Sequence, residues 1–107
     1  MKNQINPNQL SEKQMQNLIQ MFNTWFYQSE PVIKINNKYS DVISNPDSNE
    51  KLYEKLIRIQ SDLYYICLYD AGLYKIYCDG LYSIDELSEE QIEEKKRKNL
   101  IELELIQ

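Results

Sequence analysis

Residues 52–66 read LYEKLIRIQSDLYYI, and the spacing of the apolar side chains in this stretch decides the fold. These side chains recur at steps of four, three, four and three residues: Leu52, Leu56, Ile59, Leu63 and Ile66. Because an α-helix has about 3.6 residues per turn, such steps place all of them on one helical face. The stretch therefore predicts a helix that begins near Asp47 or Ser48 and presents this face to a core.

Two continuations are open beyond Tyr69. One is a single helix from residue 48 to 79, in which the apolar face continues, Gly80 forms the C-cap and the internal Gly72 costs about 1 kcal/mol relative to Ala. The other ends the helix at Gly72 and places a β-hairpin over residues 73–84. The continuity of the apolar face favours the longer helix.

Towards the N-terminus, residues 12–28 predict a second amphipathic helix. Its apolar side chains also recur at helical spacing: Met15, Leu18, Ile19, Phe22, Trp25 and Phe26. Ser11 can cap this helix by accepting a hydrogen bond from the amide of Gln14, whose side chain can reach back to the amide of Ser11. Residues 1–10 are polar and are expected to form a flexible N-terminal segment.

Residues 31–47 are predicted to connect these two helices, because Pro31 bounds the first one and turn-forming residues follow. Asn36 and Asn37 can adopt the backbone angles of a tight turn, so a short hairpin is one conformation for this connector. A hairpin by itself is marginally stable in water, so it would depend on packing against the helices.

A third helix is expected near the C-terminus, with two candidate starts. Ser83 with Glu86 and Ser88 with Gln91 both have the spacing of a capping box. Glu and Leu favour helix, so the prediction extends this helix to residue 106. The alternation of apolar and acidic residues after residue 100 is also compatible with a strand.

Together these patterns predict a single small domain over residues 1–107, of mainly α class. The expected architecture is an irregular three-helix bundle with room for a small β-hairpin, and an α+β fold is the alternative. The core is expected to draw on seven side chains: Leu18, Phe22, Trp25, Leu56, Ile59, Leu63 and Ile66.

The residue types present argue against catalysis. The sequence has no His, which removes the most common general base and the most common metal ligand. It has no glycine-rich phosphate loop, and Cys67 and Cys78 lack the second close pair that a zinc site needs. We therefore expect no enzymatic activity, no cofactor and no metal ion.

The segment from Asp79 to Leu87, DGLYSIDEL, resembles the second half of an EF-hand calcium loop. In that alignment Asp79 and Glu86 take the fifth and twelfth places of the loop. The first and third places fall on Lys75 and Tyr77, which replace two oxygen ligands and bring a positive charge to the ion. The resemblance implies a degenerate EF-hand-like module, and we expect no calcium binding in the millimolar range.

Charge and tyrosine content suggest a binding surface. Residues 1–46 carry a net charge of +1 and residues 47–107 a net charge of −6, and the stretch 79–94 holds seven acidic residues and no basic one. Exposed tyrosines are enriched at protein interfaces. The candidate partner-binding residues are Tyr69, Tyr74, Tyr77, Tyr82, Asp85, Glu86, Glu89, Glu90, Glu93 and Glu94.

The sequence therefore predicts a non-enzymatic protein-binding module whose partner has a basic surface. In type, a small, acidic, tyrosine-rich domain resembles phage or plasmid inhibitors of host nucleases, including anti-CRISPR and anti-restriction proteins. An acidic chain is a poor direct binder of nucleic acid. The alternative is a structural or homo-oligomeric subunit that pairs through apolar helix faces.

The location is predicted from the same composition. The longest apolar run, residues 63–69, has seven residues, whereas a membrane span needs about 20. The N-terminal residues lack the apolar segment of an export signal, and two cysteines suit a reducing compartment. We expect a cytoplasmic protein without membrane contact.

Overall fold

The computed structural model describes residues 3–106, and over these residues the chain is helical and contains no β-strand. The α-helices are α1 (Glu12–Tyr27), α2 (Glu30–Lys38), α3 (Ser40–Ser44), α4 (Glu50–Asp70) and α5 (Glu89–Ile106). Shorter helical segments are the 3₁₀-helices η1 (Pro7–Gln9) and η2 (Pro46–Ser48) and the π-helix η3 (Ile76–Leu81). The predicted mainly α class is confirmed.

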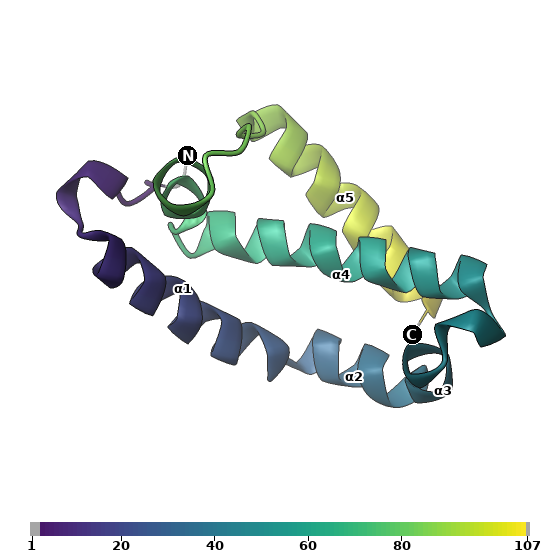
Figure 1. Cartoon of the computed structure of the whole chain (residues 1–107). Coiled ribbons are helices and arrows are strands. Elements are labelled where there is room, and N and C mark those ends of the chain that lie inside the picture. The colour runs from purple at the N-terminus through teal and green to yellow at the C-terminus, as the bar shows by residue number, and fades with distance from the viewer. Residues whose placement is uncertain (1–2, 107) are drawn as a thin grey trace.

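Helix α4 is the central element of the fold. In Figure 1, α5 lies along one side of α4, and α1 and α2 follow one another along the other side. The buried side chains form two clusters along α4. The larger cluster joins α1, the second half of α4, residues 73–78 and the start of α5, and it includes Val32 of α2. The smaller cluster consists of Ile35, Leu56, Ile59 and Ile106, so it joins α2, the first half of α4 and the end of α5.

The predicted seam on α4 is only partly the core. Leu56, Ile59 and Ile66 are buried, whereas Leu52 and Leu63 are partly buried. On α1 the prediction was wrong for Trp25, whose side chain is 58% exposed. The buried stripe of α1 is Met15, Ile19, Phe22 and Phe26. Trp25 lies on the flank of that stripe, where it lines an open groove together with Cys67 and Asp70 of α4.

The connector predicted for residues 31–47 is wrong, because these residues form α2, α3 and η2. Pro31 lies in the first turn of α2, where a missing amide hydrogen costs no helical hydrogen bond. The proline therefore begins a helix rather than ending one. Val32 and Ile35 are buried one turn apart and attach α2 to the core.

The favoured continuation beyond Tyr69, a single helix to residue 79, is wrong. The alternative is right that the helix ends at Gly72 and wrong that a β-hairpin follows. Helix α4 ends in a Schellman motif, in which the Leu73 amide donates to the Leu68 carbonyl at 3.0 Å and the Gly72 amide donates to the Tyr69 carbonyl at 3.1 Å. Gly72 has φ of +78°, a left-handed conformation that glycine adopts without a steric penalty. The chain then forms η3 in place of a hairpin, so Cys67 and Cys78 do not share a helix, and both thiols are free.

Gly80 has a different role from the predicted C-cap. It lies within η3, where a Cβ atom would approach the Met15 sulfur to 2.5 Å and the Pro7 Cβ to 2.9 Å. The glycine lets η3 contact α1 and η1 closely. This need arises from tertiary packing, so the local sequence does not indicate it.

The N-terminal residues within the described range cover the end of α4. Gln4 donates from Nε2 to the Tyr69 carbonyl at 2.9 Å and accepts at Oε1 from the Tyr74 amide at 2.8 Å. The Ile5 amide donates to the Gly72 carbonyl at 2.9 Å. The flexible segment predicted for residues 1–10 thus includes residues that bond to the turn after α4, while residues 1 and 2 lie outside the described residues.

Helix α5 begins at the second of the two candidate starts. The Ser88 amide donates to Gln91 Oε1 at 2.7 Å, and the Gln91 amide donates to Ser88 Oγ at 3.2 Å, which is the predicted capping box. Ser83 instead adopts a left-handed φ of +49° in the segment before the helix. The predicted extension of α5 to residue 106 is confirmed.

Candidate functional site

The ten predicted partner-binding residues separate into buried and exposed groups. Tyr69 and Tyr74 are buried, and the Tyr74 hydroxyl accepts a hydrogen bond from the Leu87 amide at 2.7 Å. These two tyrosines therefore pack the segment before α5 against the rest of the fold. Tyr77 is half-buried, and Tyr82 is 55% exposed. Only the last two tyrosines reach a surface that a partner could contact.

All six predicted acidic residues are exposed. Asp85 and Glu86 lie in the segment before α5, where a hydrogen bond with Asp79 raises the pKa of the Glu86 carboxyl. The other four lie on the first turns of α5 and line a shallow hollow together with Arg97: Glu89, Glu90, Glu93 and Glu94. Two of these carboxylates have basic partners on the same helix, since Glu93 pairs with Lys96 and Glu94 pairs with Arg97.

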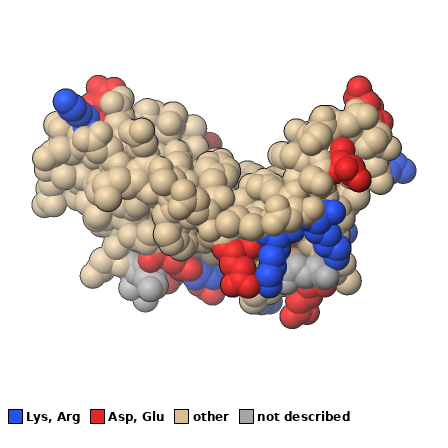
Figure 2. All heavy atoms as spheres, turned by 90° about the horizontal axis from the view of Figure 1, so that it is seen from below, with Lys and Arg blue, Asp and Glu red and all other residues tan. Residues whose placement is uncertain are grey.

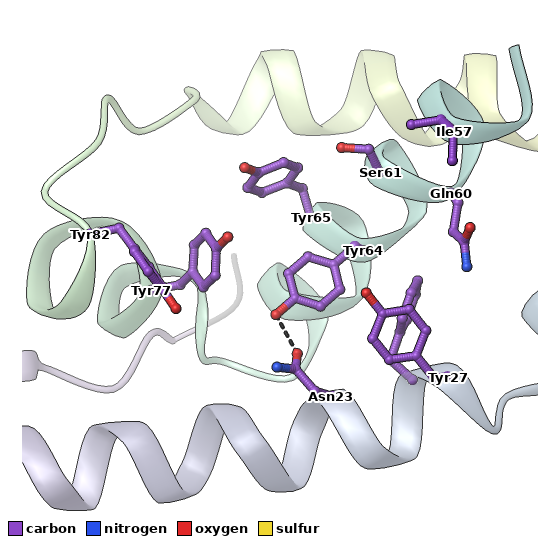
Figure 3. A pocket seen from close by; sticks show the side chains of 10 residues that line it. Asn23, Tyr27, Ile57, Gln60, Ser61, Tyr64, Tyr65, Tyr77 and Tyr82 are labelled. Atoms are coloured by element: carbon purple, nitrogen blue, oxygen red, sulfur yellow. Dashed lines mark hydrogen bonds between the residues drawn. The ribbon is translucent and has the colours of Figure 1, made fainter. Parts of the chain in front are cut away.

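A concave site lies between α1, α4 and η3, and we call it the tyrosine pocket. It has a volume of about 420 Å³. Ten residues line it: Asn23, Phe26, Tyr27, Ile57, Gln60, Ser61, Tyr64, Tyr65, Tyr77 and Tyr82. Figure 3 shows Tyr77 and Tyr82 on one side of this pocket, Tyr27 on the other and Tyr64 between them. Volumes of about 300–1,000 Å³ are typical of ligand sites.

Ring contacts fix the walls of the tyrosine pocket. The rings of Phe26 and Tyr64 meet edge to face with centroids 5.1 Å apart, and Tyr64 meets Tyr77 in the same way at 5.8 Å. Tyr77 and Tyr82 are 4.6 Å apart at their centroids. The Tyr64 hydroxyl also donates to Asn23 Oδ1 at 2.5 Å, which joins α4 to α1 across the floor of the pocket. The negative face and positive edge of the rings favour such edge-to-face pairs, which need no ionised group.

The tyrosine pocket is electrically neutral. None of its ten lining residues is charged. Burial raises the pKa of Tyr77 to about 12 and moves the pKa of Tyr64 upward as well, so both phenols stay protonated at neutral pH. The pocket can therefore donate hydrogen bonds from hydroxyl and amide groups. It offers no general base and no activated nucleophile.

A second hollow adjoins the tyrosine pocket and shares Ser61 and Tyr65 with it. Asp85 lines this hollow, as do Asp62 and Lys95, which pair at 2.8 Å. The predicted residues Tyr77, Tyr82 and Asp85 thus border one continuous surface. Tyr27 and Gln60 were missed at the sequence level, because only the packing of α1 against α4 brings them beside Tyr64.

Exposed apolar side chains gather on α1 as well. After Lys13 this helix contains no charged residue, and Met21 and Trp25 are both largely exposed. Figure 2, which views the molecule from the side of α1 and α2, shows a broad area without charged side chains. An apolar groove of about 540 Å³ follows this side of α1, and eight residues line it: Leu18, Met21, Phe22, Trp25, Cys67, Asp70, Ala71 and Leu73.

Within residues 3–106, no three His, Cys, Asp or Glu side chains come together as they would around a metal ion. In the EF-hand alignment the first half of the loop falls on residues 75–80, and residues 76–80 belong to the π-helix η3, so this half does not have the form of a calcium loop. None of the helices in the described part of the chain combines the length and apolar character that crossing a membrane requires.

We compared the chain with protein-family models, with curated proteins and with solved structures. None of the three comparisons gives a match.

Proposed function

We propose that this protein is a non-enzymatic protein-binding module that receives an uncharged segment of a partner in the tyrosine pocket. The observation that carries the proposal is a pocket of about 420 Å³ with five tyrosines and no charged residue among its lining side chains. Tyrosine is enriched among the residues that dominate binding energy at protein interfaces, because its ring buries a large area with little loss of entropy.

The chemistry of the pocket defines the segment that fits. Tyr27 and Tyr82 are more than half exposed at opposite sides and present ring surface to a ligand between them. The side-chain amides of Asn23 and Gln60 add hydrogen-bond donors. A segment with apolar side chains and free backbone carbonyls satisfies both features. A charged side chain would lose hydration without gaining an ionic partner.

The acidic residues suggest that basic residues flank that segment in the partner. Asp85 and Glu86 lie three and four residues after Tyr82, and four more carboxylates lie on the first turns of α5. Opposite charge at the rim of an interface mainly accelerates association. The finer proposal is a partner with a basic groove, such as a cytoplasmic nuclease, which this protein would occupy as an inhibitor of the anti-CRISPR or anti-restriction type.

A displayed peptide library selected against the intact protein tests the tyrosine pocket. Selected peptides should be apolar and uncharged at their centre, and Tyr82→Ala should weaken their binding at least about 10-fold, as expected for an interface anchor. Trp25→Ala is the matched control, because it also removes an exposed aromatic ring but lies outside the pocket. Binding that survives Tyr82→Ala and is lost with Trp25→Ala would move the site to the apolar groove.

Charge reversal at Glu89, Glu90 and Glu93 tests the acidic rim separately. With an identified basic partner, the triple variant should associate more slowly and with less dependence on salt, while dissociation changes little. Stopped-flow or surface-based kinetics at two salt concentrations measure both rates. An unchanged association rate would show that these residues only keep the surface of α5 hydrated. The tyrosine pocket would then remain the proposed site.

A further inference from the structure

The last turns of α5 carry apolar side chains on the face that points away from the core. Leu100, Ile101 and Leu105 are 65%, 61% and 73% exposed. The core-facing side of the same helix is marked by Ile92, Asn99 and Ile106, which are all buried. Exposed Leu and Ile side chains grouped on one helical stripe are a sign of an interface.

The charges beside this stripe have a specific arrangement. At about 100° per residue, Arg97 and Glu104 lie on one edge of the stripe centred on Ile101, and Lys98 and Leu105 lie on the other edge. Among the described residues Lys98 and Glu104 form no ion pair within the chain, and Arg97 pairs only with Glu94 on its own helix. A basic group thus precedes Ile101 and an acidic group follows it at a similar distance along the same edge.

We infer that this stripe binds the same stripe of a second copy of the chain, with the two α5 helices antiparallel and Ile101 packed against its own counterpart. A two-fold axis through Ile101 brings Arg97 of each copy beside Glu104 of the other, so the ion pair forms twice. On the opposite edge, Leu105 packs against the aliphatic part of Lys98 of the second copy. Each copy supplies both halves of every contact, as an isologous interface requires.

Charge also explains why the centre lies at Ile101. With this centre the two helices, which end at Ile106, overlap over residues 96–106. This overlap holds three basic and two acidic residues, and one of the basic residues, Lys96, is paired with Asp70 and Glu93 of its own chain. The acidic first turns, residues 89–94, then extend beyond the end of the partner helix. A centre nearer the start of α5 would place these carboxylates opposite one another, which is unfavourable for a chain of net charge −5.

The predicted association is weak. Three apolar side chains and one repeated ion pair are far fewer than the roughly 20–30 residues a side of a standard stable interface. We expect a dissociation constant on the order of 10–100 µM, which makes dimer formation dependent on concentration.

Sedimentation equilibrium of the full chain over micromolar to millimolar concentrations tests the inference. The average mass should rise from one chain to two, and Ile101→Glu should hold it at one chain throughout. Ile33→Glu is the matched control, because Ile33 is an exposed isoleucine on another helix. A single-chain mass for the unmodified protein at millimolar concentration, or equal effects of the two variants, would overturn the inference.

Paired charge variants test the antiparallel geometry. Arg97→Glu and Glu104→Arg should each be monomeric alone, because each homodimer would place like charges together. Mixed in equal amounts, they should form a heterodimer, since both ion pairs are then restored. Circular dichroism checks that each variant keeps its helix content. Dimerisation of either variant alone, or none in the mixture, would contradict this arrangement even if the unmodified chain is dimeric.

Discussion

Asn99 shows how one polar side chain can align two helices. Among residues 3–106 it is the one buried side chain that is neither apolar nor aromatic, with 3% of its surface exposed. Its Nδ2 donates to the Ile59 carbonyl on α4 at 3.0 Å. Ile92 and Ile106 are buried seven residues to either side, so α5 contacts α4 with a heptad spacing. A buried asparagine in such a seam typically fixes the register of the pair.

Two substitutions of Asn99 distinguish its role in aligning α4 and α5 from its contribution to the stability of the protein. Asn99→Asp should lower the free energy of unfolding by about 2–4 kcal/mol at neutral pH, because it buries a carboxylate against the Ile59 carbonyl and removes the donor. Asn99→Leu should stay within about 1 kcal/mol of the original, because an apolar side chain of similar size needs no partner. Urea denaturation measures both. Equal losses for the two variants would show that shape, and not hydrogen bonding, governs this position.

Alkaline pH should unfold the protein through its buried tyrosines. Burial raises the pKa of Tyr77 and of Tyr74 to about 12, above the unfolded value near 10. The folded state therefore holds these protons more tightly, and their contribution to stability is complete below about pH 10 and is lost as the pH rises towards 12. Denaturation followed at a series of pH values should show this decline. Tyr77→Phe should make the decline less steep, and an unchanged slope would contradict the assignment.

Among individual residues, the sequence predicts best where the physics is local. The capping residues Ser11 and Ser88 follow directly from spacing, and both boxes form. Trp25 could not be placed correctly, because its helical position is compatible with either the core or the flank. Which of these it takes depends on where α4 lies, and periodicity within α1 contains no information on that.

At the scale of elements, the two candidate starts of α5 can be separated by a matched pair of substitutions. Ser88→Ala should cost about 1 kcal/mol of stability, because it leaves the Gln91 amide without its acceptor. Ser83→Ala should have little effect, because Ser83 does not cap a helix in the structure. Urea denaturation of both variants gives the comparison. A larger loss at Ser83 would place the start of the helix at the earlier box.

Long periodic helices were predictable, and short ones were not. Helices α1 and α4 carry several turns of regular apolar spacing and both were predicted, although the favoured prediction extended α4 beyond its end at Asp70. Helix α2 was missed because Pro31 is compatible with either end of a helix. The π-helix η3 was missed because Gly80 is required by contacts with Met15 and Pro7, which are remote in sequence.

The candidate site, too, was predictable only where local sequence determines it. The cluster of tyrosines along α4 and the next segment indicated an interface, and Tyr77 and Tyr82 do line the tyrosine pocket. Tyr69 and Tyr74 could not be distinguished from them by composition, because burial depends on the turn at Gly72. The contribution of α1 to the pocket, through Asn23 and others, is set by tertiary packing alone.

At the scale of the whole molecule, the two apolar clusters should differ in stability. The larger cluster contains twelve buried residues and the smaller one contains four. Helix α3 has no buried residue, and α2 is held at its end by Lys38 and Tyr39, which both donate to the Ile106 carbonyl at 2.7 Å. Fewer buried contacts lower the free energy of local opening.

Hydrogen exchange measured by mass spectrometry or NMR should therefore show α2 and α3 opening before the second half of α4, with protection lower by about 10-fold or more. Tyr39→Phe should accelerate exchange in α2 and α3 and leave α1 unchanged, because it removes one of the two donors to Ile106. Tyr53→Phe on α4 serves as the control, since the Tyr53 hydroxyl makes no hydrogen bond with any of residues 3–106. Uniform protection across all helices would indicate one cooperative unit.

The position of Ile106 in the smaller cluster has a consequence for synthesis of the chain. Ile35 packs with Ile106, so a ribosome must add about seventy further residues before that core can close. During this interval the apolar side of α2 remains open to water, to chaperones or to another nascent chain. Premature termination shortly before residue 106 would leave α1 and its partners able to form, yet release a product that exposes this surface permanently.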